Sequence, residues 1–197
     1  MPRNPTSDVD HVVFTNHAIP RRPASASVAP SVDADLVPFG GGKTNARDLG
    51  LAYVMAGLRE GNAAYLDRAF RLLQEAVAQG ARDTQTLLYL AQLYRDRKDD
   101  AHARPLYEEV WRMDGEQYAA GAALGAYQMQ AGNLEEAVRL WKQTLAISPA
   151  LLLVRQNLAS ALWRTGHADQ AQETLRQALE FNPSFQPAKD LLNQIVK

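Results

Sequence analysis

The sequence predicts an all-α protein, an α-solenoid of antiparallel helix pairs with a C-terminal capping helix, preceded by a largely extended N-terminal tail. Three observations support this fold class. From residue 45 onward, apolar residues recur with helical spacing, and a pattern of about 34 residues repeats. By contrast, six of the ten prolines fall within residues 1–44. We therefore expect an extended tail and linker over 1–44 and a solenoid over 45–197.

The tail differs from the rest of the chain in composition. Its segments PASASVAPS and GGG combine proline with small residues, which favours an extended and poorly packed chain. Within it, the segment DVDHVVFTNHAIPRRP carries a short β-branched and aromatic run flanked by His11 and His17. The tail is therefore expected to stay separate from the helical region.

The repeat is clearest when the chain is aligned on Pro149 and Pro183, which lie 34 residues apart. Small residues then fall in register in the first helices (Ala91, Gly125 and Ala159) and in the second helices (Ala103, Ala137 and Ala171). Large residues follow each second-helix alanine by four positions, hence one turn along the same face: Tyr107, Trp141 and Leu175. The small residues should let the two helices of a pair approach closely.

Each element can be placed from this register. Helix pairs are expected at 84–98 with 100–113, 118–131 with 134–147, and 152–165 with 168–181, within repeats 84–117, 118–151 and 152–183. A degenerate first pair is expected at about 45–80, with Asn45 as its N-cap and a join seven residues longer than the repeat allows. Gly132 and Gly166 should end first helices in the left-handed conformation, and residues 184–197 should form the capping helix.

This pattern resembles the tetratricopeptide repeat, which has Leu-Gly and Tyr in its first helix, Ala and an aromatic residue in its second, and Pro at the exit. The resemblance implies that the first helices line a concave face that binds a protein or peptide. By phase, the candidate partner-binding residues are Tyr89, Gln92, Arg95, Ala122, Ala126, Met129, Gln156, Ser160 and Trp163. An equal alternative for Tyr89 and Trp163 is that they simply pack between neighbouring helices.

Some tetratricopeptide proteins bind a partner's C-terminal carboxylate through Lys, Asn and Arg on their first helices. The matching positions here are Leu88, Gln92, Ala123, Leu153 and Asn157, so the basic residues are missing. The sequence therefore favours an extended or helical apolar peptide, or another protein's surface, as the partner.

No motif in the sequence supports catalysis, so we expect no enzyme activity, no metal site and no cofactor in this chain. The segment FGGGKTN has Val37 where a phosphate-binding loop needs its leading glycine, and a flexible joint is the better interpretation. His102 and His167 have no metal-spaced partner, and the chain has no cysteine.

Composition also bears on partners and location. The net charge of −1 argues against nucleic-acid binding, and no apolar stretch approaches the roughly 20 residues of a membrane-inserted helix. The first residues lack the apolar stretch of a signal peptide, and the location is left open. The leading hypothesis is a non-catalytic protein–protein interaction scaffold.

A second resemblance supports an alternative from another class. Met1-Pro2-Arg3, His11, Thr15, His17, Ile19 and Arg21-Arg22 are similar to the segment that ends the haem region of multihaem c-type cytochromes with C-terminal tetratricopeptide repeats. The resemblance implies that the chain is the C-terminal fragment of a periplasmic electron-transfer protein. Haem c would then be held by a longer parent, with His17, or less favourably His11, as an axial ligand.

Overall fold

The computed structural model describes residues 3–4, 14–15, 35–36 and 44–196. It divides the chain into two compact units, Met1–Asp35 and Leu36–Lys197. In the first unit, strands β1 (Arg3–Asn4) and β2 (Phe14–Thr15) pair in antiparallel orientation, with Arg3 opposite Thr15. The hypotheses about His11, His17 and the glycines of FGGGKTN concern residues outside the described ranges.

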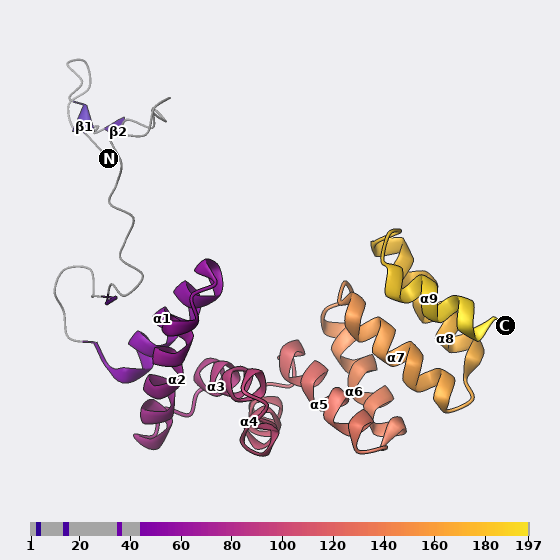
Figure 1. The fold of residues 1–197 in the computed structure, drawn as a ribbon, viewed down its shortest axis with the longest axis horizontal. Coiled ribbons are helices and arrows are strands. Elements are labelled where there is room, and N and C mark those ends of the chain that lie inside the picture. Colours follow the sequence, from indigo (N-terminus) through magenta and orange to yellow (C-terminus); the bar gives the residue numbers. More distant parts are fainter. Residues whose placement is uncertain (1–2, 5–13, 16–34, 37–43, 197) are drawn as a thin grey trace. The chain divides into compact units, whose positions relative to one another are not determined.

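The second unit is built from helix pairs followed by a single helix (Figure 1). The pairs are α1 (Ala46–Glu60) with α2 (Ala63–Ala78), α3 (Thr84–Asp96) with α4 (Asp100–Met113), α5 (Tyr118–Gln130) with α6 (Leu134–Ile147), and α7 (Leu152–Arg164) with α8 (Ala168–Phe181); α9 (Gln186–Ile195) follows. The predicted all-α solenoid with a terminal helix is confirmed. Predicted and observed helix ends in the three regular repeats agree within two residues.

Small residues allow close packing within each pair, as the register predicts. A Cβ atom built on Gly125 would collide with the indole ring of Trp141. Trp141 is completely buried, and its Nε1 donates a hydrogen bond of 3.1 Å to the carbonyl oxygen of Ala122. Tyr107 and Leu175, at the matching positions of the neighbouring repeats, are also completely buried.

Left-handed residues end the first helices of the regular repeats. Gly132 and Gly166 have φ angles of 83° and 84°, as predicted, and their amides donate back to the last turn of the preceding helix. At the matching position of the earlier repeat, Lys98 has a φ of 63°. Helix α3 therefore ends at Asp96, in register with the ends of α5 and α7 and two residues before the predicted end at 98, and the chain turns in the same way without a glycine.

The degenerate first pair is longer than the others. The Asn45 side chain accepts a hydrogen bond from the Asp48 amide, which confirms the predicted N-cap. Helices α1 and α2 contain 15 and 16 residues and are joined by residues 61–62, so the helices themselves absorb the extra residues. The Leu36 amide donates a 2.9 Å hydrogen bond to the hydroxyl of Tyr53, which ties Leu36 to this pair.

The apolar core forms three buried clusters along the helical unit. One joins α1, α2 and α3 around Tyr53 and Leu73, and the second joins α3 to α6 around Tyr107. The third joins α6 to α9 around Leu158 and Leu175. Each cluster extends across a boundary between repeats, so every helix pair is stabilised by its neighbours.

First helices of neighbouring repeats approach closely between α1 and α3, between α5 and α7, and between α7 and α9. The same close approach is not seen between α3 and α5. A hollow lies there instead, and it borders the candidate functional site.

Candidate functional site

A groove of about 710 Å³ crosses the first helices from α3 to the start of α9. We call it the first-helix groove. It is lined by Arg95, Ala122, Ala123, Ala126, Ala150, Leu151, Leu152, Leu153, Val154, Asn157 and Phe185. These residues come from α3, α5, the connection between α6 and α7, α7 itself, and the N-cap of α9.

The composition of α5 explains why the groove is open. This helix consists largely of alanine and glycine, so Ala122 and Ala126 leave space where longer side chains would stand. On the opposite wall, Leu153 near the start of α7 is 65% exposed. Phe185 is half-buried. The floor and walls are thus mostly apolar and accessible, which is typical of a surface that another molecule covers.

Arg95 lies at one end of the groove and also borders a second, polar hollow of about 360 Å³. The residues lining this polar hollow are Arg95, Asp96, Lys98, Asp100, Ala123, Ala126, Tyr127 and Gln130. Within the hollow, the Tyr127 hydroxyl donates a 2.8 Å hydrogen bond to Asp100 Oδ1. Burial raises the pKa of Tyr127, and the bond to the Asp100 carboxylate adds to this shift.

The Arg95 guanidinium lies over the ring of Tyr107, with its Cζ atom 5.8 Å from the ring centroid. The Tyr107 side chain is completely buried, and burial raises the pKa of its hydroxyl to about 12. The hydroxyl has no hydrogen-bond partner in the described part of the chain. Tyr107 is therefore a neutral platform beneath Arg95.

The structure brings only some of the predicted partner-binding residues together. Arg95, Ala122 and Ala126 line the first-helix groove, whereas the remaining six predicted residues do not. Tyr89 packs against the N-terminal core cluster and Met129 against the C-terminal one, while Trp163 is 38% exposed. Gln92, Gln156 and Ser160 are half-buried on their helices.

Several groove residues are absent from the predicted partner-binding set. Leu151 and Phe185 lie at the N-caps of α7 and α9, where the helical phase used to select the first-helix face does not apply. The signal that could have found Leu151 is the apolar run of residues 151–154, which closely follows Pro149 and has more leucine than one buried helix face requires.

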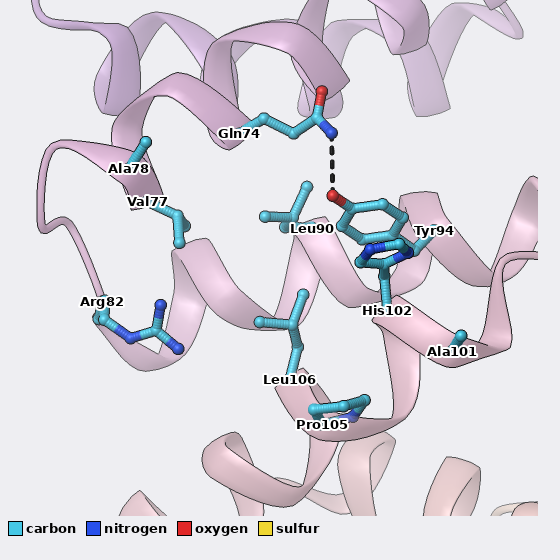
Figure 2. Close-up of a pocket in the computed structure, with 10 residues that line it drawn as sticks. All are labelled: Gln74, Val77, Ala78, Arg82, Leu90, Tyr94, Ala101, His102, Pro105 and Leu106. Carbon is cyan, nitrogen blue, oxygen red and sulfur yellow. Dashed lines mark hydrogen bonds between the residues drawn. The ribbon is translucent and has the colours of Figure 1, made fainter.

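A third hollow, of about 410 Å³, lies where α2, α3 and α4 meet (Figure 2). Gln74 Nε2 donates a 2.9 Å hydrogen bond to the Tyr94 hydroxyl. The His102 ring stacks on Tyr94 with centroids 5.1 Å apart, and its Nδ1 lies 2.8 Å from the Asp99 carboxylate. His102 thus has partners within its own repeat, and this hydrogen bond lowers the pKa of Asp99.

Short side chains account for this third hollow. Ala78, Ala101 and Pro105 line it. Thirty-four residues further along the chain, the matching positions hold Arg112, Glu135 and Arg139. The junction of α2, α3 and α4 therefore has short side chains at positions where the next repeat has long charged ones, and this leaves the hollow open.

Two further features concern the described residues, a metal site and a membrane-spanning helix. No group of three or more histidine, aspartate or glutamate side chains there could hold a metal ion. None of the helices in that part of the chain is both long and apolar enough to span a bilayer.

Comparison with known proteins identifies the repeat. Two family models described as tetratricopeptide repeat match residues 84–113 and 128–195. No curated protein matches the sequence.

Solved structures of MamA are similar in fold. MamA AMB-1 has a TM-score of 0.64 at 22% identity, over 76% of this chain and 84% of that one. The MamA RS-1 ArsTM double mutant has a TM-score of 0.64 at 16% identity, over 78% and 85%. MamA MSR-1 has a TM-score of 0.54 at 23% identity, over 70% and 75%. At these identities the likeness concerns the fold, and together with the family models it establishes that this chain contains tetratricopeptide repeats arranged as a helical solenoid.

Proposed function

We propose that this chain is a non-catalytic scaffold that binds a segment of a protein partner in the first-helix groove. Tetratricopeptide repeats typically serve protein interaction, which supports the general class. The observation that carries the specific proposal is the groove itself, about 710 Å³ of mostly apolar, accessible space along the first helices. Concave apolar surfaces of this kind gain binding free energy when a partner removes them from water.

Leu153 is the expected anchor of the interaction. Its side chain is 65% exposed, so it presents apolar surface to water at the wall of the groove. Burying an exposed leucine in an interface contributes on the order of 1–2 kcal/mol. Ala122 and Ala126 supply the space beside it, so an aliphatic side chain of the partner can lie over these two alanines and against Leu153.

A capture experiment tests the groove. The full chain is immobilised and exposed to a lysate of its source, and captured proteins are identified and compared between variants. Leu153→Asp should abolish capture of a groove-bound partner, because it places a charge on the apolar wall. Tyr89→Ala and Trp163→Ala test the predicted residues that lie outside the groove.

The matched control is Met113→Asp, at an exposed residue at the end of α4 that borders none of the three hollows. It introduces the same charge on an apolar surface residue and should leave capture unchanged. Equal capture by the parent chain, Leu153→Asp and Met113→Asp would contradict the proposed groove.

A second candidate function is electron transfer as the C-terminal part of a multihaem c-type cytochrome. The observation that favours it is the resemblance of Met1-Pro2-Arg3, His11, His17 and the residues around them to the segment that ends the haem region of such proteins. Haem added to the full chain should give a six-coordinate Soret band that is lost in His17→Ala. No spectral change on haem addition would sink this candidate and leave the scaffold.

A further inference from the structure

The first-helix groove has an uneven charge distribution. Arg95 is the one charged residue among those that line it, and Asn157 is the one uncharged polar residue. The other lining side chains are aliphatic or aromatic. A partner that is apolar throughout would therefore cover a cation.

Arg95 has no carboxylate within ion-pair distance in the part of the chain that the structure describes. Several other arginines do: Arg47 pairs with Asp83, Arg82 with Glu109, Arg97 with Asp67 and Arg139 with Glu136. Arg95 instead lies exposed over the neutral ring of Tyr107.

The two carboxylates nearest in sequence are poorly suited to neutralise Arg95. Asp96 is the next residue of the same helix, and adjacent side chains diverge by about 100°. Asp100 Oδ1 accepts the hydrogen bond of the Tyr127 hydroxyl, and within the described residues neither Asp96 nor Asp100 lies within ion-pair distance of Arg95. Covering Arg95 without a counter-ion would bury an unpaired charge, which is strongly unfavourable.

We infer that the segment bound in the groove is aliphatic and carries an aspartate or glutamate side chain that pairs with Arg95. This inference rests on the proposed function, and it names the chemistry of the partner. The aliphatic side chains lie over Ala122, Ala126 and Leu153, and the carboxylate meets the guanidinium at the end of the groove. A planar guanidinium suits this contact because it can donate two parallel hydrogen bonds to one carboxylate.

The carboxylate belongs to a side chain and not to the end of the partner. Beyond Arg95 the groove borders the polar hollow, which gives the partner's main chain room to continue. A chain end placed inside that hollow would set its carboxylate beside those of Asp96 and Asp100, which is unfavourable.

Peptide binding to the full chain tests the inference. The probes are short fluorescent peptides of leucine and serine, acetylated and amidated at their ends, with one aspartate, asparagine or lysine at the same position. Fluorescence anisotropy gives each Kd. The aspartate peptide should bind about tenfold more tightly than the asparagine peptide, and the preference should shrink at high salt.

Variants of Arg95 isolate the pairing. Arg95→Gln should remove the preference for aspartate over asparagine, and Arg95→Glu should reverse it in favour of lysine. Arg164→Gln is the matched control, because Arg164 is an exposed arginine in the last turn of α7 as Arg95 is in the last turn of α3. It should keep the preference. A thermal melt of each variant verifies that the fold is intact.

The outcomes separate the inference from the proposed function. In one outcome, the aspartate and asparagine peptides bind equally well and Leu153→Asp abolishes the binding of both. That result overturns the inference but still supports the first-helix groove as the binding site. Tighter binding only to peptides with a free C-terminal carboxylate also overturns it. If none of the peptides binds, the inference is overturned. It is also overturned if the chain forms a dimer and Leu153→Asp abolishes that dimer, because a second copy would then cover the groove. Peptide binding that Leu153→Asp leaves unchanged contradicts the groove itself.

Discussion

At the scale of single residues, Lys98 shows how one position departs from its repeat without changing the fold. Later repeats place Gly132 and Gly166 at the matching turn. Lys98 adopts the same left-handed conformation, with its amide bonded to the carbonyl oxygen of Arg95 at 2.9 Å. An L-residue with a Cβ atom pays roughly 1–2 kcal/mol in this region of backbone space, whereas glycine does not.

Replacing Lys98 with glycine should therefore raise the free energy of unfolding by about 1 kcal/mol, after allowing for the greater freedom of glycine in the unfolded chain. Urea denaturation followed by circular dichroism measures this change. Lys98→Ala is the control, because it removes the same side chain but keeps the Cβ atom. Equal stabilisation by both variants would show that the lysine side chain, and not the backbone conformation, is responsible.

At the scale of the helices, the start of α3 depends on one carboxylate with two roles. Asp83 caps the helix by accepting hydrogen bonds from the amide and hydroxyl of Thr86, at 3.2 and 2.7 Å. It also pairs with Arg47 of α1 through two hydrogen bonds, at 2.7 and 2.9 Å. The bonds from Arg47, followed by those from Thr86, hold the pKa of Asp83 well below its usual range.

This lowered pKa makes the stability depend on pH in the acid range. The folded state binds the Asp83 proton more weakly than the unfolded state, so the stabilisation is present above the ordinary pKa of about 4 and is lost as pH falls below it. Asp83→Asn should keep the cap but remove the ion pair, at a cost of under about 1 kcal/mol at pH 7. Denaturation curves between pH 7 and 2 should show that acidification lowers the free energy of unfolding less in this variant than in the parent chain.

Asp169→Asn, at an exposed carboxylate in the first turn of α8, is the control and should leave the acid loss unchanged. An equally steep acid loss in the parent chain and in Asp83→Asn would assign the pH dependence to other carboxylates.

The sequence predicts the helices better than it predicts the groove, for a physical reason. Helix register follows from local rules, and the repeated glycines and alanines reveal which faces pack, as Gly125 against Trp141 illustrates. The groove depends on how neighbouring repeats meet. Arg95 follows from helical phase, whereas Leu151 and Phe185 enter the groove from the N-caps of α7 and α9, where phase gives no guidance.

At the scale of the whole helical unit, stability depends on contacts between neighbouring repeats. The third core cluster ends beneath α9, whose Ala188 is buried and whose Leu191, Leu192 and Ile195 are partly buried against that cluster. The capping helix therefore covers an apolar face that α7 and α8 would otherwise expose. Its effect should be strongest on its neighbours and weaker in repeats that share no core cluster with it.

The double substitution Leu191→Ala and Leu192→Ala tests this gradient. Both side chains are partly buried, so their truncation should lower the local stability of α7, α8 and α9 by about 2 kcal/mol. Native-state hydrogen exchange should show faster exchange, by roughly tenfold or more, in these helices and little change in α1 and α2. Val196→Ala, at a residue 66% exposed, should change neither region. In a solenoid with nearest-neighbour coupling, a defect at one end weakens the adjacent repeats first. An equal loss of protection from α1 to α9 would contradict this gradient and would mean that the helical unit unfolds as one cooperative block.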